Sequence, residues 1–528
     1  MRGILASSIG VTCAAALALP LAPPAVASAE RPAPTADAAT RAAVNSSTSH
    51  VPEAPGSTQS LPLGPLTHDR ASGAVLGLAP RAVRNFSLLG VVWDDPSAAL
   101  HGRVQVRTRA ASTGEWSDWQ DVETHYTEHG ADPDSAEAAS GRVRGATAPL
   151  WVGESNGVEV RVRPEAGGAE AGGAEAGGAE AGGAEAGGAE AGDPVGGAPE
   201  PDAEAGDVDP VDVGSGDAGS GAVGAGEAGA GEAVAGGGDA PALPAGMRLD
   251  LVDPGEAEPD EAAPSGSGAE APRTGVMTAA AKAASAANSD IVPLGATEIP
   301  MLTAEETRRE LVTLRGSELT EQQQADAHIG PRPSIVTRRG WGADESLREK
   351  NFSYTSKVKA AFVHHTASGN GYSCSQAPSL IRGFYRYHTK SLGWRDIGYN
   401  FLVDKCGRIY EGRAGGVAKA VKGAHTLGFN SKTTGIAVIG SYGSKKPSSK
   451  AVKAVARLTA WKLGLYGMNP KAKTTLTSGG GNLYAKGKKV KMKVISGHRD
   501  GFNTSCPGGK LYKKLSSVRS KAAGYQGR

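Results

Sequence analysis

The pattern of hydrophobic and polar positions changes several times along the chain. Between residues 84 and 163, short apolar runs alternate with polar positions, as in Val104-x-Val106 and Val158-x-Val160-x-Val162. Alternation with a period of two, with turn residues between the runs, is typical of antiparallel β-strands. The alternation returns at Met247-x-Leu249-x-Leu251. We therefore predict an antiparallel β domain over 84–253, in which the strands that flank the intervening segment pair with each other.

Two segments lack the apolar side chains that a folded core needs. From 165 to 190 the pentad Glu-Ala-Gly-Gly-Ala repeats, and Gly-, Ala- and acid-rich sequence continues to 245. Such a segment cannot bury enough apolar surface to offset the entropy of ordering it. We predict that 165–245 is a disordered insertion within the β domain. The Ala-, Pro-, Ser- and Thr-rich residues 30–80 are expected to be disordered as well.

The remaining chain is predicted to contain a linker and a second domain. Residues 254–330 read as a linker that carries one short polar helix over 303–325, because Thr303 and Glu306 have the spacing of a helix capping box. From 331 to 525, apolar runs typical of buried strands interleave with helical spacings. The strands are expected at 359–364, 398–403, 408–410 and 435–439, and the helices near Pro378 and over 450–465. This interleaving predicts an α/β domain with a central mixed β-sheet flanked by helices.

The cysteines bear on the compartment in which the protein folds. Residues 1–29 resemble a secretory signal peptide, with a basic start, an apolar run and a small-residue cleavage site. Its removal leaves three thiols, of which two should pair in an oxidising environment. We pair Cys374 with Cys406, which flank one helix-plus-strand unit. Cys506 is then unpaired, and metal ligation would explain why it stays reduced.

Charge is distributed very unevenly. Residues 331–528 contain 37 basic and 7 acidic residues, whereas the rest of the chain contains 19 basic and 48 acidic residues. A basic exported domain is attracted to polyanions. Anionic cell-wall polymers fit better than nucleic acid, because the basic residues are scattered and no aromatic-interleaved motif accompanies them. No other stretch offers the ~20 apolar residues that span a bilayer, so we expect a secreted monomer without a transmembrane anchor.

Three short patches supply the candidate chemistry. Phe-Val-His-His-Thr contains His364 and His365, Ser-Gly-His-Arg-Asp contains His498, and Ser-Cys-Pro-Gly contains Cys506. Two imidazoles and one thiolate would leave the fourth position of a tetrahedral Zn²⁺ open, as in a catalytic site. Adjacent residues of a strand face opposite sides, so only one of the two neighbouring histidines can be a ligand, and spacing does not choose between them. Tyr399 is one candidate for a hydroxyl that stabilises an oxyanion.

The order of these motifs resembles the peptidoglycan recognition protein family, which shares its fold with type-2 N-acetylmuramoyl-L-alanine amidases. The motifs that carry the resemblance are Val-His-His-Thr (363–366), Gly-Trp-Arg-Asp-Ile-Gly-Tyr-Asn-Phe (393–401), Tyr-Glu-Gly-Arg (410–413), Gly-Ala-His-Thr-Leu-Gly-Phe-Asn (423–430), Gly-His-Arg-Asp (497–500) and Thr-Ser-Cys-Pro-Gly (504–508). They span roughly 333–515. Bacterial exported members of the family often carry N-terminal extensions such as the one here.

The resemblance implies a specific assignment of residues. Zn²⁺ would be held by His364, His498 and Cys506, and Tyr399 and Thr504 would be the catalytic polar groups beside it. The substrate would be peptidoglycan, cut at the amide between the lactyl group of N-acetylmuramic acid and L-alanine.

We expect other roles for the remaining histidines of this domain. His425 and His365 are candidates for substrate contact, and His388, on the apolar face of a helix, is better explained as a core histidine.

Two alternatives remain at this point. Family members that lack the cysteine ligand bind peptidoglycan without cutting it, so a binding-only recognition module is the main alternative. The retention of Cys506 favours the enzyme. A purely structural zinc site is disfavoured because the sequence offers only three recognisable ligands.

Overall fold

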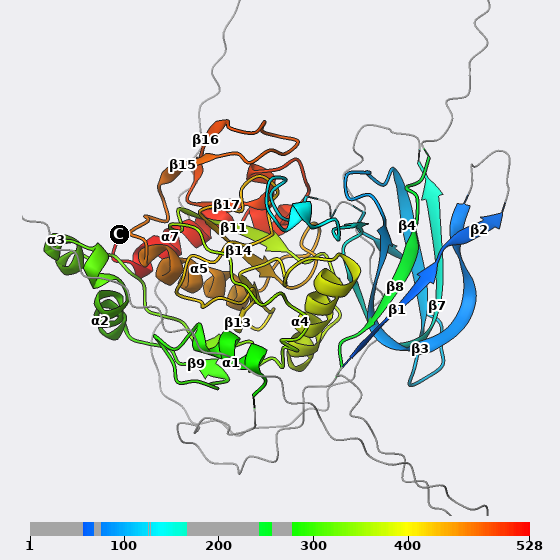
Figure 1. Ribbon diagram of the computed structural model, residues 1–528, viewed down its shortest axis with the longest axis horizontal. Helices are drawn as coiled ribbons and strands as arrows, with labels where there is room; N and C mark the ends of the chain where they lie inside the picture. The colour runs from blue at the N-terminus through cyan, green and yellow to red at the C-terminus, as the bar shows by residue number, and fades with distance from the viewer. Residues whose placement is uncertain (1–55, 68–74, 125, 127, 166–241, 256–276) are drawn as a thin grey trace, which may run out of the picture. The chain divides into compact units, whose positions relative to one another are not determined.

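The computed structural model describes residues 56–67, 75–124, 126, 128–165, 242–255 and 277–528 (Figure 1). The predicted signal peptide, the predicted disorder of 30–55 and nearly all of the predicted insertion lie outside these ranges. The described residues belong to one compact unit of the chain. Within them, no helix combines the length and the apolar character needed to cross a membrane.

The first part of the chain forms an antiparallel β-sheet, as predicted. Its strands follow the order β1-β8-β3-β7-β4-β5, and β2 and β6 also pair with β3. They are β1 (Ser57–Pro62), β2 (Gly64–Thr67), β3 (Val75–Trp93), β4 (Gly102–Ala110), β5 (Gln120–Val122), β6 (Gly145–Ala146), β7 (Leu150–Pro164) and β8 (Arg248–Asp253). The inward positions of the alternating runs, among them Val104, Val106, Val158 and Val160, form its core.

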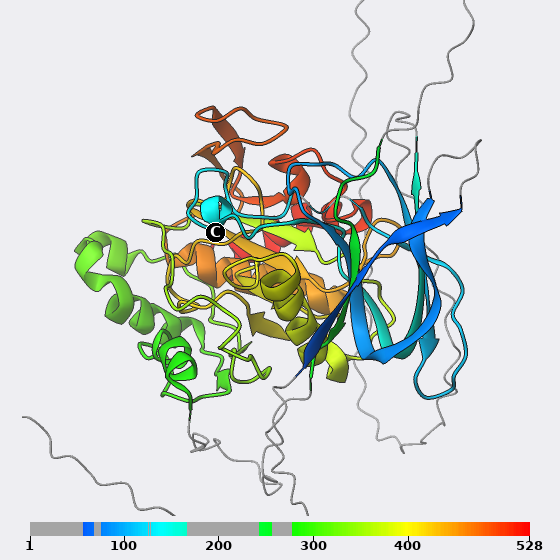
Figure 2. The same ribbon diagram turned by 45° about the vertical axis from the view of Figure 1, so that its right-hand side comes forward.

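Two expectations for this domain are wrong. The strands on either side of the insertion, β7 and β8, do not pair with each other, because each pairs with β3 instead; in Figure 2 the green β8 lies among the blue strands. Alternation identifies a strand but says nothing about its neighbour. Residues 57–67 were expected to be disordered, yet β1 pairs with β8 along its whole length. Proline is tolerated there because β1 is at the sheet edge.

The second part of the chain is the predicted α/β domain with a mixed sheet. Its strand order is β17-β11-β14-β12-β13-β10-β9. The strands are β9 (Glu298–Ile299), β10 (Ile335–Val336), β11 (Ala360–His365), β12 (Phe401–Val403), β13 (Ile409–Glu411), β14 (Thr433–Val438) and β17 (Ile495–Gly497). The pairs β12–β13 and β10–β9 are antiparallel and the other four are parallel. A separate hairpin consists of β15 (Lys473–Thr477) and β16 (Lys489–Lys493).

Helices cover both faces of this sheet (Figure 1). The helices α5 (Ser449–Gly464) and α7 (Leu515–Tyr525) pack on one face, where Val455 and Val518 meet Val363 and Ile436. Helix α4 (Ala377–Arg386) packs on the other face. The remaining helices are α1 (Ala279–Ala286), α2 (Ala304–Arg315), α3 (Glu321–Ala325) and α6 (Gly509–Tyr512), together with the short 3-10 helices η1 (Ala138–Ser140), η2 (Gly316–Glu318), η3 (Cys374–Gln376) and η5 (His498–Asp500) and the π-helical turn η4 (Tyr387–Ser391).

The segment predicted to be a linker differs from that expectation between 279 and 330. Thr303 and Glu306 form the predicted capping box, but the single helix expected over 303–325 is two helices, α2 and α3, separated at Gly316. Leu311 and Ile329 join the main core of the α/β domain, and β9 extends its sheet. The few apolar side chains of this segment are enough to pack it against the α/β domain. They are too few to produce a periodic pattern that would predict a core.

The predicted disulfide is present. Cys374 and Cys406 are bonded, and Cys506 is free and buried. The bridge ties η3 to the turn between β12 and β13.

Candidate metal centre

The end of strand β11 brings His364 to the centre of the candidate site. All six residues of β11 are buried. Ala361 and Val363 face the α5 side of the sheet, and alternation directs His364 to the opposite side. His365 therefore faces away from His364, and its Nδ1 accepts a hydrogen bond of 3.3 Å from the backbone N–H of Tyr442.

His498 and Cys506 reach the same point from the segment after β17. Because β17 runs parallel to β11, both strands end at the same edge of the sheet. His498 begins η5, directly after β17, and is fully buried. The chain then returns, with the N–H of Arg499 donating to the carbonyl of Cys506 over 3.0 Å. This fold-back places the thiol of Cys506, 2% exposed, beside the imidazoles.

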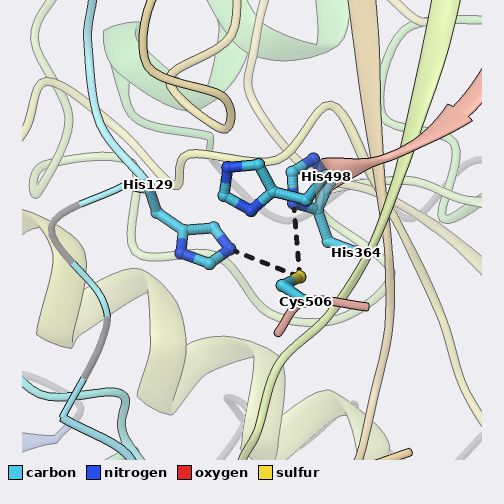
Figure 3. A group of neighbouring side chains, drawn as sticks. All are labelled: His129, His364, His498 and Cys506. Carbon is cyan, nitrogen blue, oxygen red and sulfur yellow. Dashed lines mark hydrogen bonds between the residues drawn. The ribbon is translucent and has the colours of Figure 1, made fainter. Parts of the chain in front are cut away.

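A fourth potential ligand, His129, comes from the β domain (Figure 3). The donor atoms of His129, His364, His498 and Cys506 all lie within 4.8 Å of one another. Cys506 Sγ is 3.8 Å from Nδ1 of His364 and 3.9 Å from Nε2 of His129. Ligand atoms around a tetrahedral Zn²⁺ are about 3.3–3.6 Å apart, given Zn–N and Zn–S bonds of about 2.0–2.3 Å. The group is therefore wider than a zinc site, and its donor atoms would move closer together around a bound ion.

Buried histidine nitrogens of this group that have no hydrogen-bond partner are also consistent with a bound metal. Among the described residues, Nδ1 and Nε2 of His498 and Nδ1 of His129 are buried without a hydrogen-bond partner of acceptable geometry. Buried polar atoms without partners are rare and call for an explanation. Imidazole nitrogens and thiolate sulfurs are among the ligands that Zn²⁺ takes in tetrahedral sites. We conclude that these residues fit a bound zinc ion.

Electrostatics favours the metal-binding protonation state of the histidines. Burial, followed by the neighbouring histidines, lowers the pKa of His129 and His364 well below the ordinary value. Burial is also the main cause that lowers the pKa of His498. All three are neutral at neutral pH, as metal ligation requires. Burial raises the pKa of the Cys506 thiol, and a divalent cation is the charge that would stabilise its thiolate.

Tyr399 and Thr504 lie next to the potential ligands. The ring centroids of Tyr399 and His364 are 5.5 Å apart, and burial raises the pKa of Tyr399, so its hydroxyl is protonated at neutral pH. The hydroxyl of Thr504 accepts a hydrogen bond of 3.1 Å from the N–H of Cys506. The same hydroxyl donates to Oε1 of Glu128 over 2.6 Å.

The remaining histidines occupy distinct places. His425 is fully buried, its ring centroid is 5.3 Å from that of His364, and burial lowers its pKa to about 3. It packs against Gly435, where an added Cβ would come within 2.3 Å of its ring. His388 is a core histidine, as predicted. Its Nδ1 accepts from the N–H of Gly398, and its Nε2 lies 2.7 Å from the hydroxyl of Tyr126.

Sequence reasoning did not find His129 or its neighbours Tyr126 and Glu128. His129 is 377 positions from Cys506, and no motif connects the two. The available signal was the long stretch between β5 and β6, since long connections inside compact domains are frequently functional. Because His129 is a fourth potential ligand, the number of ligands no longer counts against a structural zinc site.

Comparison with known proteins finds one family model that matches each part of the chain. Residues 354–509 match the family model described as N-acetylmuramoyl-L-alanine amidase, and residues 39–188 match a model described as Rv3811 N-terminal galactose-binding domain-like. Peptidoglycan-recognition protein SC2 of Drosophila simulans is 31% identical over 182 residues, which cover 34% of this chain and 84% of that protein. Human N-acetylmuramoyl-L-alanine amidase is 30% identical over 185 residues, 35% of this chain and 28% of that enzyme.

Solved structures include similar chains. Wild-type Drosophila PGRP-LB is 27% identical and covers 35% of this chain and 92% of its own, with a TM-score of 0.28. The sequence match to the Drosophila simulans protein covers most of that relative. The chain belongs to the family of peptidoglycan recognition proteins and type-2 N-acetylmuramoyl-L-alanine amidases.

Proposed function

We propose that the chain is a zinc-dependent N-acetylmuramoyl-L-alanine amidase that hydrolyses the amide between the lactyl group of peptidoglycan and L-alanine. The observation that carries the proposal is the meeting of His364, His498 and Cys506 beside Tyr399. A module that only recognises peptidoglycan has no need for a buried thiol among imidazoles. The match to the amidase family model supports the same conclusion.

The roles of the residues follow from their chemistry. His364, His498 and Cys506 would hold Zn²⁺, which supplies a Lewis acid that polarises a carbonyl and makes water more acidic. Tyr399 keeps its proton because its hydroxyl is buried, so it would donate a hydrogen bond to the oxygen that becomes negative as the amide is attacked. Thr504, fixed by the N–H of Cys506, would orient a polar group of the substrate. His425 and His365 are proposed to contribute to substrate binding.

We also propose that the protein is secreted. The disulfide between Cys374 and Cys406 supports an oxidising compartment. The first 29 residues, which resemble a signal peptide, point the same way.

The full chain and purified peptidoglycan provide the test. After long incubation, mass spectrometry should detect free stem peptides that begin with L-alanine. The peptides should disappear when a chelator is present and return when Zn²⁺ is added back. Cys506→Ser should give none, whereas His101→Ala, at an exposed position of the β domain, should behave as the wild type. Binding to peptidoglycan with no peptide released at any zinc concentration, by the wild type or by His129→Ala, would identify a recognition module instead.

A further inference from the structure

One segment of the β domain contacts the potential metal ligands and both candidate catalytic residues, Tyr399 and Thr504. It follows β5 and includes Tyr126, Glu128 and His129. The segment continues to η1, and in Figure 2 this part of the chain is drawn in cyan and reaches the α/β domain. The hydroxyl of Tyr126 lies 3.4 Å from that of Tyr399, and the carboxylate of Glu128 accepts from Thr504. His129 joins the metal group itself.

The contacts leave the centre closed. His364 and His498 are 0% exposed, Tyr399 is 1% exposed, and His129 above them is 5% exposed. The ring of His129 lies 4.5 Å from that of His498 and 5.3 Å from that of His364, centroid to centroid. A peptidoglycan strand cannot reach the ligands while this ring is in place.

Polar contacts anchor the segment on the α/β domain. Oδ1 of Asp132 accepts from the backbone N–H groups of Gly428 and Asn430 and from the Asn430 side chain, and Asp132 also pairs with Lys422 at 3.2 Å. The carbonyl of Glu128 accepts from the N–H of Leu427. These bonds hold the backbone on both sides of His129. The position of His129 is therefore set by a network, not by its own ring alone.

We propose that His129 is the fourth ligand of the metal and that Tyr126 together with residues 128–137 forms a built-in inhibitory segment. Three imidazoles and one thiolate would supply all four ligands of a tetrahedral Zn²⁺ and would leave no position for water. The chain in this conformation is latent, and hydrolysis requires the segment to withdraw. This inference rests on the proposed zinc amidase function. It extends that function by assigning the β domain the role of a regulator of the catalytic centre.

Cobalt substitution tests the fourth ligand without relying on activity. Co²⁺ takes the same ligands as Zn²⁺, and its absorption bands report coordination number and the thiolate bond. The full wild-type chain loaded with Co²⁺ should give a four-coordinate spectrum that added imidazole does not change. His129→Ala should change the spectrum, and imidazole should restore the wild-type form by filling the vacated position. His101→Ala should match the wild type.

Two results would overturn the proposal. One is a wild-type spectrum that shifts with imidazole, since it would reveal an open position. The other is a His129→Ala spectrum identical to that of the wild type. The wild-type titration needs no variant, so it decides the question even if His129→Ala does not fold; His129→Gln, closer in volume to the native side chain, then replaces it.

Activity separates this inference from the proposed function. If both are right, His129→Ala should release stem peptides at an initial rate at least about tenfold above the wild type, because the inhibited state no longer dominates the population. If no variant releases peptides while the cobalt spectra behave as expected, the ligand assignment stands and the amidase function fails. A wild-type rate equal to that of His129→Ala would contradict the inhibitory role.

Discussion

Glu137 and Arg413 form a buried, two-pronged ion pair between the β domain and the α/β domain. Nη1 of Arg413 is 2.9 Å from Oε2 of Glu137, and Nη2 is 2.9 Å from Oε1. Both side chains are 7% exposed. A buried charge whose partner is removed remains desolvated and unpaired, which makes such pairs costly to break. This pair is therefore a main attachment of the inhibitory segment, which consists of Tyr126 and residues 128–137.

Breaking this pair should destabilise the protein. Glu137→Ala is expected to lower the free energy of unfolding by about 3–5 kcal/mol, the usual cost of leaving a buried charge without its partner. Urea unfolding measures it. Glu137→Ala combined with Arg413→Ala should cost less than the two single changes together. Strict additivity of the two changes would show that the ion pair is not energetically coupled.

The same pair predicts a pH dependence on the acid side. Burial opposes ionisation of Glu137, but Arg413 outweighs it, so the pKa of Glu137 lies below its ordinary value of 4.5. The folded state then binds a proton less readily than the unfolded state, and the stabilisation is present above pH 4.5 and lost as the pH falls below it. Glu137→Gln should reduce the dependence of the unfolding free energy on pH in that range. An unchanged slope would contradict this assignment.

Glu411 should make the stability of the protein depend on pH in the opposite direction, with stability falling as the pH rises. Burial raises its pKa from 4.5 to about 7, although Oε1 accepts from the Asn288 side chain and Oε2 from the N–H of Arg338. The folded state therefore holds the proton more tightly than the unfolded state, and stability should fall by about 3 kcal/mol as the pH rises from 4.5 to 7. Thermal unfolding of Glu411→Gln across this range should show a smaller decline. Equal declines in variant and wild type would locate the effect elsewhere.

The disulfide should contribute to stability independently of the metal. Cys374 and Cys406 are 32 positions apart, and closing a loop of that length is worth about 4 kcal/mol in the chain-entropy treatment. The double variant Cys374→Ser, Cys406→Ser should unfold at a lower temperature, as calorimetry would measure. It should keep its cobalt spectrum, since Cys506 is unaffected. A lost cobalt–thiolate band would mean that the bridge also shapes the metal group.

Tyr399 should act on the transition state rather than on metal binding. In the His129→Ala background, Tyr399→Phe is expected to lower kcat by about 100-fold or more, the typical cost of removing one oxyanion donor, with little change in KM or zinc content. Tyr466→Phe, whose hydroxyl bonds to the carbonyl of Ala418, serves as the matched control. A loss confined to KM would assign Tyr399 to substrate binding.

The α/β domain could be predicted well because its signals are local. The strand that ends at His364, the helix that begins near Pro378 and the capping box at Thr303 each depend on residues a few positions apart. Counting the cysteines, together with the position of Cys374 and Cys406 on either side of one helix-plus-strand unit, was enough to pair them. In each case a short stretch of sequence contained both the feature and its cause.

The arrangement around the metal group could not be predicted in the same way. His129 meets Cys506 only because the β domain contacts the α/β domain, and Asp132 and Glu137 secure that contact by bonds to residues far along the chain. No spacing or periodicity encodes such a pairing. The neighbours of β8 were missed for the same reason, since alternation does not determine which strand lies beside which.

Hydrolysis in water labelled with heavy oxygen shows which bond of peptidoglycan the enzyme breaks. An amidase that cuts between the lactyl group and L-alanine must place the oxygen of water in the lactyl carboxylate of the glycan strand. We expect His129→Ala to release unlabelled stem peptides with a free L-alanine amino group and to leave labelled lactyl groups behind, and Cys506→Ser to do neither. Label in the released peptides, or the absence of any released peptide, would contradict this expectation.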